Sequence, residues 1–392
     1  LPWYCISRLD TVDARLLALM REAGCESMCY GIDSGSKRTL SFIRKHIDHG
    51  ILYQRVMETS DQGITPTLSF VIGFPEEEKE DIDQTLRLAL RAGIVGNNNP
   101  LIQLPTVLPG TDLHKKYRER LVREVDTYFA LGLEFDEGSR LKSDEEMINS
   151  DPVLFSTFYN VPCPGRSLEE LNLLASYFPL MVRFYPKTFL LLGLECNESI
   201  SDLFIHWLHW LKGHLKRKEL TLSPQDCYLH FRDFVSQVLI KDKKRTRQHF
   251  SDVLKYETLT LEVGKLTSDK SIFQIDLNQV KKFKPVKSKR MIVEVFDFNL
   301  PLIILDLKAG QFEKEYPLQK TLLVFRQEDG LLDVSEINAF ARDFLDLCDG
   351  ETSLQAISQE LYHRYGQDLK PGNFFDACVE AIQVLGKKRF LE

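Results

Sequence analysis

A chain of 392 residues with 43% hydrophobic and 27% charged side chains has enough apolar material for two or three packed domains. Its formal charge of -7 argues against a nucleic-acid-binding protein that relies on a global positive field. The eight cysteines are sparse and unevenly spaced, no signal peptide precedes them, and the longest apolar run, 189–194, is far below the roughly 20 residues that cross a bilayer. We therefore expect a cytoplasmic protein without a membrane span.

Short apolar strands alternate with amphipathic helices from residue 1 to about 117, which is the pattern of β-α units around a parallel sheet. The strands are predicted in WYCIS (3–7), ESMCYGI (26–32), TPTLSFVIGFP (65–75) and PLIQLPTVLPGT (100–111). The helix after the second strand is predicted to carry Leu40, Ile43 and Ile47 on one face. We expect an α/β fold class, but four parallel strands cannot close a (β/α) barrel, and the first would expose a long edge.

Residues 118–265 are predicted to form a mainly helical accessory region, and 266–318 a β-rich connector. The clearest helices contain SLEELNLLASYF (167–178) and ISDLFIHWLHWLKGHLKRK (200–218), and strands are predicted at 257–263, 291–298 and 300–307. We interpret the basic segments 241–247 and 281–290 as solvated helix faces or linkers.

Two histidines of the second of these helices, His206 and His209, have the i, i+3 spacing of metal ligands. The flanking Trp207 and Trp210 favour a packed amphipathic helix instead. We therefore predict no metal site in this region.

Residues 319–392 form a compact pattern of two strands followed by three short helices, as in a winged-helix module. TLLVFR and GLLDV are the predicted strands, joined by a hairpin turn at QEDG. Ser335 is predicted to cap the first helix, which carries Ile337, Phe340 and Phe344. Thr352 or Ser353 is predicted to cap the second.

The turn after the second strand combines an acid with small polar residues: Asp33, Ser34, Gly35 and Ser36. Ser36 is a good N-cap for the following helix, with Gly35 relaxing the backbone. A cap does not explain the acid, however. In α/β proteins ligands bind at the carboxyl ends of parallel strands, so the turn is also a candidate binding site.

Three ordered segments resemble the radical S-adenosylmethionine (SAM) superfamily, particularly the branch that often has a cobalamin-binding domain. GIDSGSKRTLSFIRK is similar to the family's G-I-E-S-G-S segment, TPTLSFVIGFPEEEKEDIDQTL to its I-x-G-x-P-G-E-T segment, and QLPTVLPGTDL to its P-x-P-G-T turn. The resemblance implies that SAM is the cofactor. The residues it implicates in cofactor binding are Arg8, Asp33, Ser34, Ser36, Ile72, Gly73 and Pro105.

The chain departs from that family in several places. Asp33 is one methylene shorter than the usual glutamate, and Glu76 and Glu78 replace the glycine and threonine of the second segment. The C-x-x-x-C-x-x-C motif that holds a 4Fe-4S cluster is missing: Cys25 and Cys29 have the first spacing, but Ile32 stands at the third position. We therefore expect these two cysteines to be ordinary buried thiols.

These departures leave two interpretations open. In the first, the chain is the carboxyl-terminal part of a radical SAM enzyme, whose cluster ligands, first two strands and any cobalamin domain lie upstream. In the second, it is a degenerate barrel without radical chemistry, which another chain could complete. Whether the intact protein uses cobalamin stays open in both.

Residues 319–392 resemble the PqqD-type domains that recognise ribosomally made, post-translationally modified peptides. The resemblance rests on FLDLCDGETSLQAISQELYHRYG and FFDACVEAIQVLGKKRFL. It implies that a leader peptide adds as a strand to the sheet edge, here TLLVFR, in front of Phe340 and Phe344. A DNA-binding role is disfavoured because the helix at 353–365 has few basic side chains. We expect a peptide-modifying enzyme or, as the alternative, a noncatalytic peptide-carrier or partner-binding protein.

Overall fold

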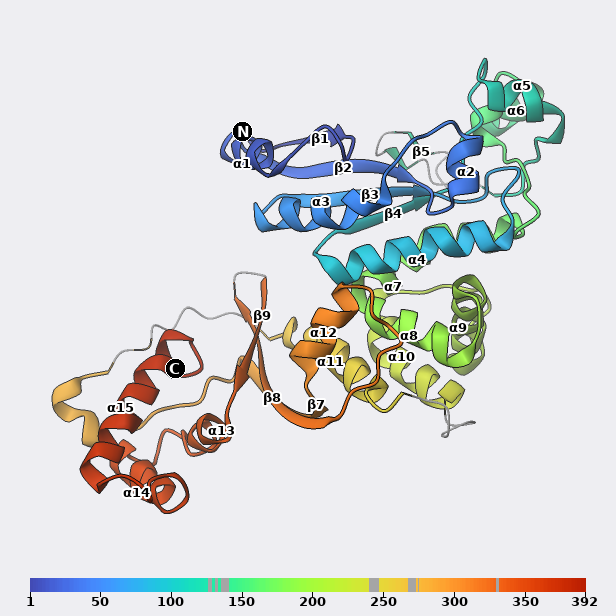
Figure 1. Cartoon of the computed structure of the whole chain (residues 1–392). Helices are drawn as coiled ribbons and strands as arrows, with labels where there is room; N and C mark the ends of the chain where they lie inside the picture. Colours follow the sequence, from blue (N-terminus) through green and yellow to red (C-terminus); the bar gives the residue numbers. More distant parts are fainter. Residues whose placement is uncertain are drawn as a thin grey trace. The chain divides into compact units, whose positions relative to one another are not determined.

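The computed structural model describes residues 1–125, 129–130, 133–134, 141–239, 247–266, 273, 275–328 and 331–392. The chain divides into two compact units (Figure 1). The first comprises Leu1–Arg247 with Asp306–Phe312, and the second comprises Gln248–Leu305 with Glu313–Glu392. Within the described ranges, no helix has the length and apolar character needed to span a membrane.

The first unit is built on a four-stranded parallel sheet, which confirms the predicted α/β class. Its strands are β1 (Trp3–Ser7), β2 (Cys25–Asp33), β3 (Thr65–Val71) and β4 (Asn99–Gln103), in the order β1-β2-β3-β4. The helices that connect them are α1 (Ala14–Glu22), α2 (Lys37–Phe42), α3 (His49–Asp61) and α4 (Lys79–Val95). All four strands begin where the alternation of apolar residues predicts.

The two faces of this sheet differ in side-chain size and polarity. Met28, Tyr30 and Ile32 of β2 are fully buried on one face, and Leu68 and Phe70 of β3 are buried beside them. The other face is only half-buried and combines small or polar side chains with larger apolar ones, such as Val71 and Leu101. It includes Cys29, Gly31, Thr67, Ser69 and Gln103. The sheet thus has an apolar core on one side and a partly open surface on the other.

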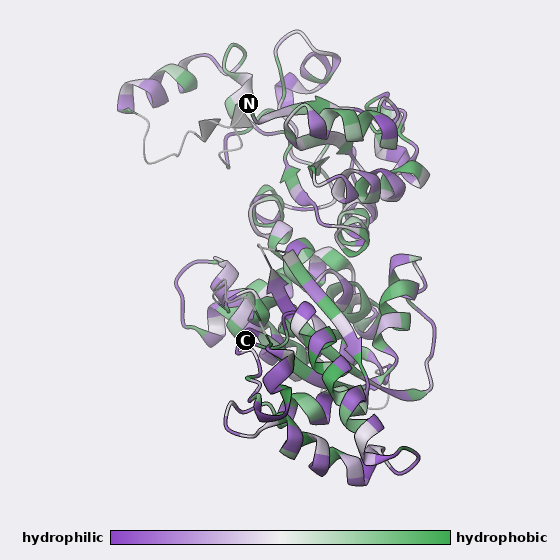
Figure 2. Cartoon of the chain, turned by 90° about the vertical axis from the view of Figure 1, so that its left-hand side faces the viewer, coloured by the Kyte–Doolittle hydropathy of each residue, from purple (hydrophilic) through white to green (hydrophobic). Residues whose placement is uncertain are grey.

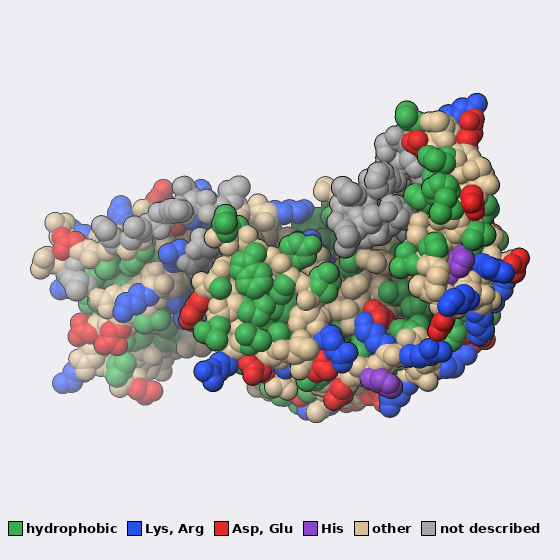
Figure 3. Space-filling view, turned by 90° about the horizontal axis from the view of Figure 1, so that it is seen from above, with side chains coloured by type: hydrophobic (Ala, Val, Ile, Leu, Met, Phe, Trp, Pro, Cys, Tyr) green, Lys and Arg blue, Asp and Glu red, His purple; other side chains and the backbone are tan. Residues whose placement is uncertain are grey.

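Strand β1 leaves one edge of the sheet exposed, as the sequence predicts. Tyr4 and Ile6 are 69% and 68% exposed, and their register opposite Ser27 and Cys29 places them on the open face. Figure 3, seen from above, shows hydrophobic side chains gathered over β1 and α1.

Helix α2 is shorter than predicted. It ends at Phe42, and Arg44 adopts a left-handed backbone conformation with φ of 55°, which an α-helix cannot continue through. The prediction that Ile47 continues the helix is wrong. Residues 43–48 form a connecting loop, and Asp48 caps α3 by accepting a hydrogen bond from the Gly50 backbone N–H at 2.8 Å.

The rest of the first unit is mainly helical, as predicted. It contains α5 (Asp112–Tyr117), η1 (Arg118–Arg120), β5 (Phe129–Ala130), β6 (Leu133–Glu134), α6 (Lys142–Ser150), η3 (Ser156–Phe158), α7 (Leu168–Phe184), α8 (Pro186–Cys196), α9 (Ile200–His214) and α10 (Pro224–Leu239). Trp207 of α9 is fully buried, and its ring packs against Phe231 at 5.5 Å and Phe234 at 5.1 Å between centroids. His206 is half-exposed, so the packed-helix interpretation of α9 fits the structure.

The second unit contains an antiparallel sheet in the order β7-β8-β9. Its elements are α11 (Phe250–Val263), η5 (Leu277–Lys282), β7 (Met291–Phe298), β8 (Leu318–Glu328), β9 (Leu331–Ile337), α13 (Ala339–Asp346), α14 (Leu354–Tyr365) and α15 (Pro371–Lys387); α12 spans Leu300–Lys308. The strands predicted at 257–263 and 300–307 are wrong, since these residues lie in α11 and α12. Both segments are short apolar runs, which are compatible with either structure by pattern alone.

Three helices pack on this sheet around a shared apolar core. The core includes Phe344, Leu354, Ile357, Leu361, Phe374, Cys378, Ile382 and Leu385, with Met291 and Val324 from the strands. Figure 2 shows hydrophobic and hydrophilic residues interspersed along these helices. Ser335 was predicted to cap the first of these helices, but β9 continues to Ile337 and Asn338 caps α13 instead. Ser353 caps α14, while the predicted hairpin turn falls at 329–330, outside the described residues.

Gly35 lets the turn after β2 lie directly on the backbone of α4. A Cβ atom at this position would be 2.4 Å from the Gln84 carbonyl oxygen and 2.8 Å from the Thr85 Cα. These neighbours are backbone atoms of a helix, so they cannot move aside cheaply. The close approach therefore fixes the turn against α4.

We expect Gly35→Ala to lower the free energy of unfolding of the first unit by about 1–3 kcal/mol. Gly213→Ala is the matched control, since a Cβ there meets nothing within 4 Å. In α9 this change should be neutral or stabilising by up to about 1 kcal/mol. Urea denaturation followed by tryptophan fluorescence measures both, because Trp3, Trp207 and Trp210 all lie in the first unit. Equal stability of the two variants would contradict the close approach.

Candidate functional site

The carboxyl end of β2 turns sharply at Asp33. This residue has a left-handed backbone with φ of 59°, the pairing with β3 shifts register between Gly31 and Asp33, and the Ser34 N–H bonds back to the Ile32 carbonyl at 2.8 Å. The Asp33 side chain is 24% exposed and forms an ion pair with Lys45. The Lys45 Nζ lies 3.2 Å from the place of a Cβ on Gly31, so the glycine makes room for the ammonium group.

Ser34 and Ser36 are buried, and their hydroxyls hold the turn together. The Ser34 Oγ accepts from the Ser36 N–H at 3.1 Å and pairs with the Thr85 Oγ1 at 3.0 Å. The same Thr85 oxygen accepts from the Gly35 N–H at 2.9 Å. The Ser36 Oγ donates to the Asp81 carboxylate at 2.6 Å and caps α2, as predicted. Their predicted contact with a cofactor stays a prediction.

Asp81, in the first turn of α4, connects this turn to the loop after β3. Its carboxylate also accepts from the Arg38 guanidinium and from the Glu78 N–H. Burial alone would raise the pKa of Asp81, but the hydrogen bonds from Arg38 and Ser36 outweigh it and lower the pKa. The charged carboxylate therefore holds α2 and α4 together around the turn.

Glu77 performs a similar role in the loop after β3, where its side chain is only 1% exposed. It accepts hydrogen bonds from the Gly73 N–H at 2.6 Å, the Phe74 N–H at 3.1 Å and the Thr39 hydroxyl at 2.9 Å. Burial nevertheless raises the pKa of Glu77 to about 7. The carboxyl thus links the loops that follow β2 and β3 and titrates near neutral pH.

The remaining predicted residues follow β3 and β4. Ile72 donates its N–H to the Gln103 carbonyl at 2.9 Å, and Gly73 has a φ of 92° that favours glycine. A Cβ on Gly73 would be 2.7 Å from a methyl group of Leu171. Ile72, Gly73 and Pro105 are all buried at the same edge of the sheet as Asp33.

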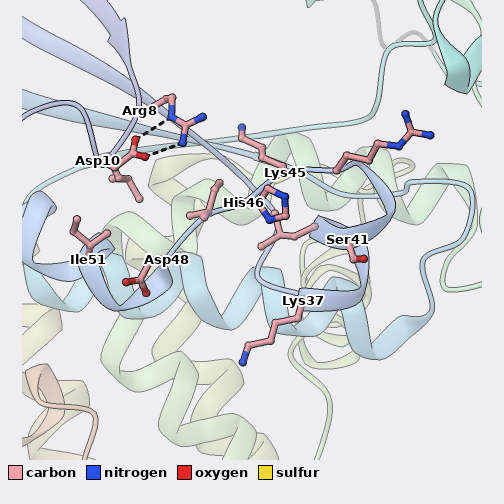
Figure 4. Close-up of a pocket in the computed structure, with 13 residues that line it drawn as sticks. Arg8, Asp10, Lys37, Ser41, Lys45, His46, Asp48 and Ile51 are labelled. Carbon is pink, nitrogen blue, oxygen red and sulfur yellow. Dashed lines mark hydrogen bonds and ion pairs between the residues drawn. The ribbon is translucent and has the colours of Figure 1, made fainter.

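An open cavity of about 890 Å³ lies beside the carboxyl ends of β1 and β2 (Figure 4). Its lining residues are Arg8, Leu9, Asp10, Gly31, Lys37, Leu40, Ser41, Arg44, Lys45, His46, Ile47, Asp48 and Ile51. Of the predicted site residues, Arg8 lines this cavity, whereas Asp33 does not line it but forms an ion pair with the lining residue Lys45. Ser34, Ser36, Ile72, Gly73 and Pro105 are not among the lining residues.

The sequence interpretation missed several residues of this site. Thr85 and Asp81 support the turn from 45 to 51 residues away, and no local pattern marks them. Glu77 matches the glutamate of the second family motif, but its bond to Thr39 of α2 was not predicted. One sequence signal could have indicated the basic residues of the cavity: the segment 34–47 contains Lys37, Arg44, Lys45 and His46 but no acid.

The described residues do not fit a 4Fe-4S cluster. Cys25 is buried and Cys29 is half-buried on the sheet, and no group of three or more His, Cys, Asp or Glu side chains suited to a metal ion occurs within the described ranges. We therefore derive no chemistry through a cluster. Asp33 offers a carboxylate acceptor next to Lys45, which lines the open cavity.

Comparisons with known proteins give partial similarities. No family model matches the chain. Over 113 residues the chain is 32% identical to the uncharacterized methyltransferase PH0819 of Pyrococcus horikoshii. The match covers 29% of this chain and 24% of that protein, so the chain spans about a quarter of its relative.

Two solved structures are also similar in part. One is the radical SAM methyltransferase TsrM from Kitasatospora setae with cobalamin and a 4Fe-4S cluster bound, with a TM-score of 0.28, 17% identity and coverage of 30% of this chain and 23% of that chain. The other is coproporphyrinogen III oxidase (HemN) from Escherichia coli, a radical SAM enzyme, with a TM-score of 0.26, 12% identity and coverage of 38% and 31%. Because both scores are below 0.5, our description of the fold rests on the strand order and register of this chain.

Glu77 gives the site a pH-dependent stability. Its folded pKa of about 7 lies above the usual value of 4.5, so between these values the unfolded chain releases a proton that the folded chain keeps. This contribution therefore favours the folded state fully below about pH 4.5 and is lost as the pH rises to 7.

We expect Glu77→Gln to remove that contribution. The difference in unfolding free energy between wild type and variant should change across pH 5–7.5, with the wild type losing stability relative to the variant as the pH rises. Glu76→Gln is the control, because Glu76 is exposed and should give a far smaller pH-dependent difference. Urea titrations at several pH values measure this, and a pH-independent difference for Glu77→Gln would show that the carboxyl does not titrate there.

Proposed function

We propose that the chain is part of a radical SAM enzyme that modifies a peptide, with the first unit binding the SAM nucleoside and the second recognising the peptide. The observation that carries the first half is the position of Asp33 at the carboxyl end of β2, where its carboxylate pairs with Lys45 of the cavity lining. The three motifs resembling the family and the partial identity to a methyltransferase support the same assignment.

SAM supplies a 5'-deoxyadenosyl radical when an intact radical SAM enzyme cleaves it reductively. This chain's residues would bind and orient its nucleoside. The Asp33 carboxylate would accept a hydrogen bond from a ribose hydroxyl, and the backbone after β3 would lie against the adenine. The cluster ligands would have to come from residues outside this sequence, and a role for cobalamin is a further part of the proposal.

Asp33→Asn tests the nucleoside site. Replacing the carboxylate removes a charge-assisted acceptor, and we expect the dissociation constant for SAM to rise about tenfold or more. Isothermal titration calorimetry with SAM measures it, and Asp61→Asn, an exposed residue at the end of α3, is the control with the same chemical change. Equal SAM affinity of wild type and Asp33→Asn would refute the assigned role.

The peptide-binding half of the proposal needs a free sheet edge, and the predicted edge is wrong. TLLVFR lies in β8, which pairs with β7 on one side and β9 on the other. Phe344 is fully buried in the core behind the sheet, while Phe340 is half-buried. A peptide strand therefore cannot add to β8.

One of the two outer edges is already occupied. Asp252 of α11 accepts from the backbone N–H groups of Asp297 and Phe298, at 2.8 and 3.1 Å. The Lys255 ammonium donates to the Val295 carbonyl at 2.9 Å. Side chains of α11 thus occupy backbone groups at the carboxyl end of β7.

Strand β9 is the open edge of this sheet. Within the described part of the chain, its strand pairing is with β8 alone. An exposed Leu332 and the half-buried Val334 and Phe340 lie on it or directly after it. Added peptide strands gain main-chain hydrogen bonds at such edges and specificity from neighbouring side chains. We therefore place the proposed leader-peptide site at β9.

Proline substitutions at Ser335 and Glu336 test this edge. Successive N–H groups along a strand point to opposite sides, so one of the two residues bonds to β8 and the other faces the edge. We expect the variant that removes an N–H bonded to β8 to lose stability. The variant that removes an N–H at the open edge should keep its stability and lose about tenfold or more in peptide affinity.

The probe for this test is a fluorescein-labelled peptide selected on the wild-type chain from a random extended library, with binding followed by fluorescence polarisation. Unchanged affinity in the stable variant would contradict recognition at β9. Peptide binding combined with a complete absence of SAM binding would favour the alternative, a noncatalytic peptide-carrier protein with a degenerate barrel.

A further inference from the structure

Positive charge is concentrated at the cavity of the first unit, in a chain whose net charge is -7. Lys37, Arg38, Arg44 and Lys45 follow one another between residues 34 and 47 without an intervening acid. Three of these four line the cavity, and Arg8 lies across it at the end of β1 (Figure 4). These basic residues therefore line the same cavity, and in Figure 4 the Lys37 side chain extends away from Lys45 and His46.

The acids at the cavity are already engaged. Asp10 forms a two-point pair with Arg8 at 2.8 and 2.9 Å, and Asp33 pairs with Lys45. Asp48 caps α3 through the Gly50 N–H. Asp10 and Asp33 are thus paired with cations, whereas Asp48 accepts only from a neutral N–H group and keeps its negative charge at the cavity.

Two cations remain available for a ligand. Arg44 contacts Asp112 at 3.2 Å, but the two side chains are 82% and 72% exposed, and such a surface pair contributes little. Lys37 makes no ion pair among the residues that the structure describes. His46, also exposed at the cavity, adds a donor. We call Lys37, Arg44 and His46 the basic rim.

SAM does not account for the basic rim. Its sulfonium and ammonium groups outnumber its single carboxylate, so the cofactor has a net positive charge, and its one carboxylate does not require several cations. A second ligand with negative charge would gain from them, because a cation cluster at a cavity raises the local concentration of anions. The basic rim is therefore better suited to binding a substrate than to binding the cofactor.

We propose that the basic rim binds carboxylates of an acidic peptide substrate. This inference rests on the proposed function, since it assigns the substrate of the same site. Lys37 and Arg44 are long, solvent-exposed side chains on separate segments, α2 and the loop after it, which suits several carboxylates along an extended peptide.

The test uses two fluorescein-labelled peptides that differ only in charge, one with alternating Glu and Ala and the other with alternating Gln and Ala. Fluorescence polarisation measures their binding to the full chain. We expect the Glu peptide to bind at least about fivefold more tightly and its affinity to fall with added salt. Equal affinities for the two peptides would overturn the proposal.

Lys37→Gln/Arg44→Gln tests the assignment to the rim. We expect the double variant to lose about three- to tenfold in affinity for the Glu peptide. The control Arg15→Gln/Lys218→Gln removes the same charge from two exposed positions outside the cavity and should change the affinity less than twofold. If the control variant lost as much affinity for the Glu peptide, the effect would come from net charge alone, and binding at the basic rim would be refuted. Complete displacement of the Glu peptide by millimolar inorganic phosphate would reassign the rim to a phosphate group and overturn the carboxylate assignment.

The outcome is separable from that of the proposed nucleoside site. Wild-type binding of the Glu peptide without SAM binding would uphold the basic rim and refute the nucleoside site. SAM binding with no discrimination between the two peptides would refute the rim alone.

Discussion

The arrangement of the candidate site depends on the hydrogen bonds that fasten the turn after β2 to the first turns of α4. Thr85 holds the Ser34 hydroxyl and the Gly35 N–H, and Asp81 holds Ser36 and Arg38. The bonds of Ser34 to Thr85 and of Ser36 to Asp81 are buried, where leaving a polar group unpaired is costly, so they fix one conformation of the turn. Asp33 immediately precedes this fixed turn, and its side chain is therefore presented beside the cavity.

Support for the site comes mainly from one helix and the loop before it. Glu77 ties the loop after β3 to α2, while Asp81 and Thr85 tie α4 to the turn after β2. The ends of β2 and β3 are thus kept in register by residues that do not themselves face the cavity. A ligand at this edge of the sheet would meet a preformed surface, which lowers the ordering cost of binding.

The sequence predicted the four parallel strands because each has a regular alternation of apolar residues, as in Met28, Tyr30 and Ile32 of β2. It failed at α11 and α12, where the short apolar runs ETLTLEV and LPLIILDL fit a strand and a buried helix equally well by pattern alone. It also placed Asp33 correctly at a strand end, but not its partner Lys45, because the left-handed Arg44 that ends α2 leaves no clear mark in the sequence. The contacts of Thr85 with the turn and of Asp252 with β7 join residues far apart in the sequence. They depend on tertiary packing and could not be predicted from the local sequence.

The central claim is that the carboxyl end of β2, with the residues that follow it, lines a nucleoside pocket. Amide hydrogen exchange of the full chain with and without saturating SAM tests it most directly. The account predicts slower exchange in residues 31–45 and in the loop after Val71, with little change in β9. SAM binding that leaves exchange in residues 31–45 unaltered, or slows it only in the second unit, would contradict the account.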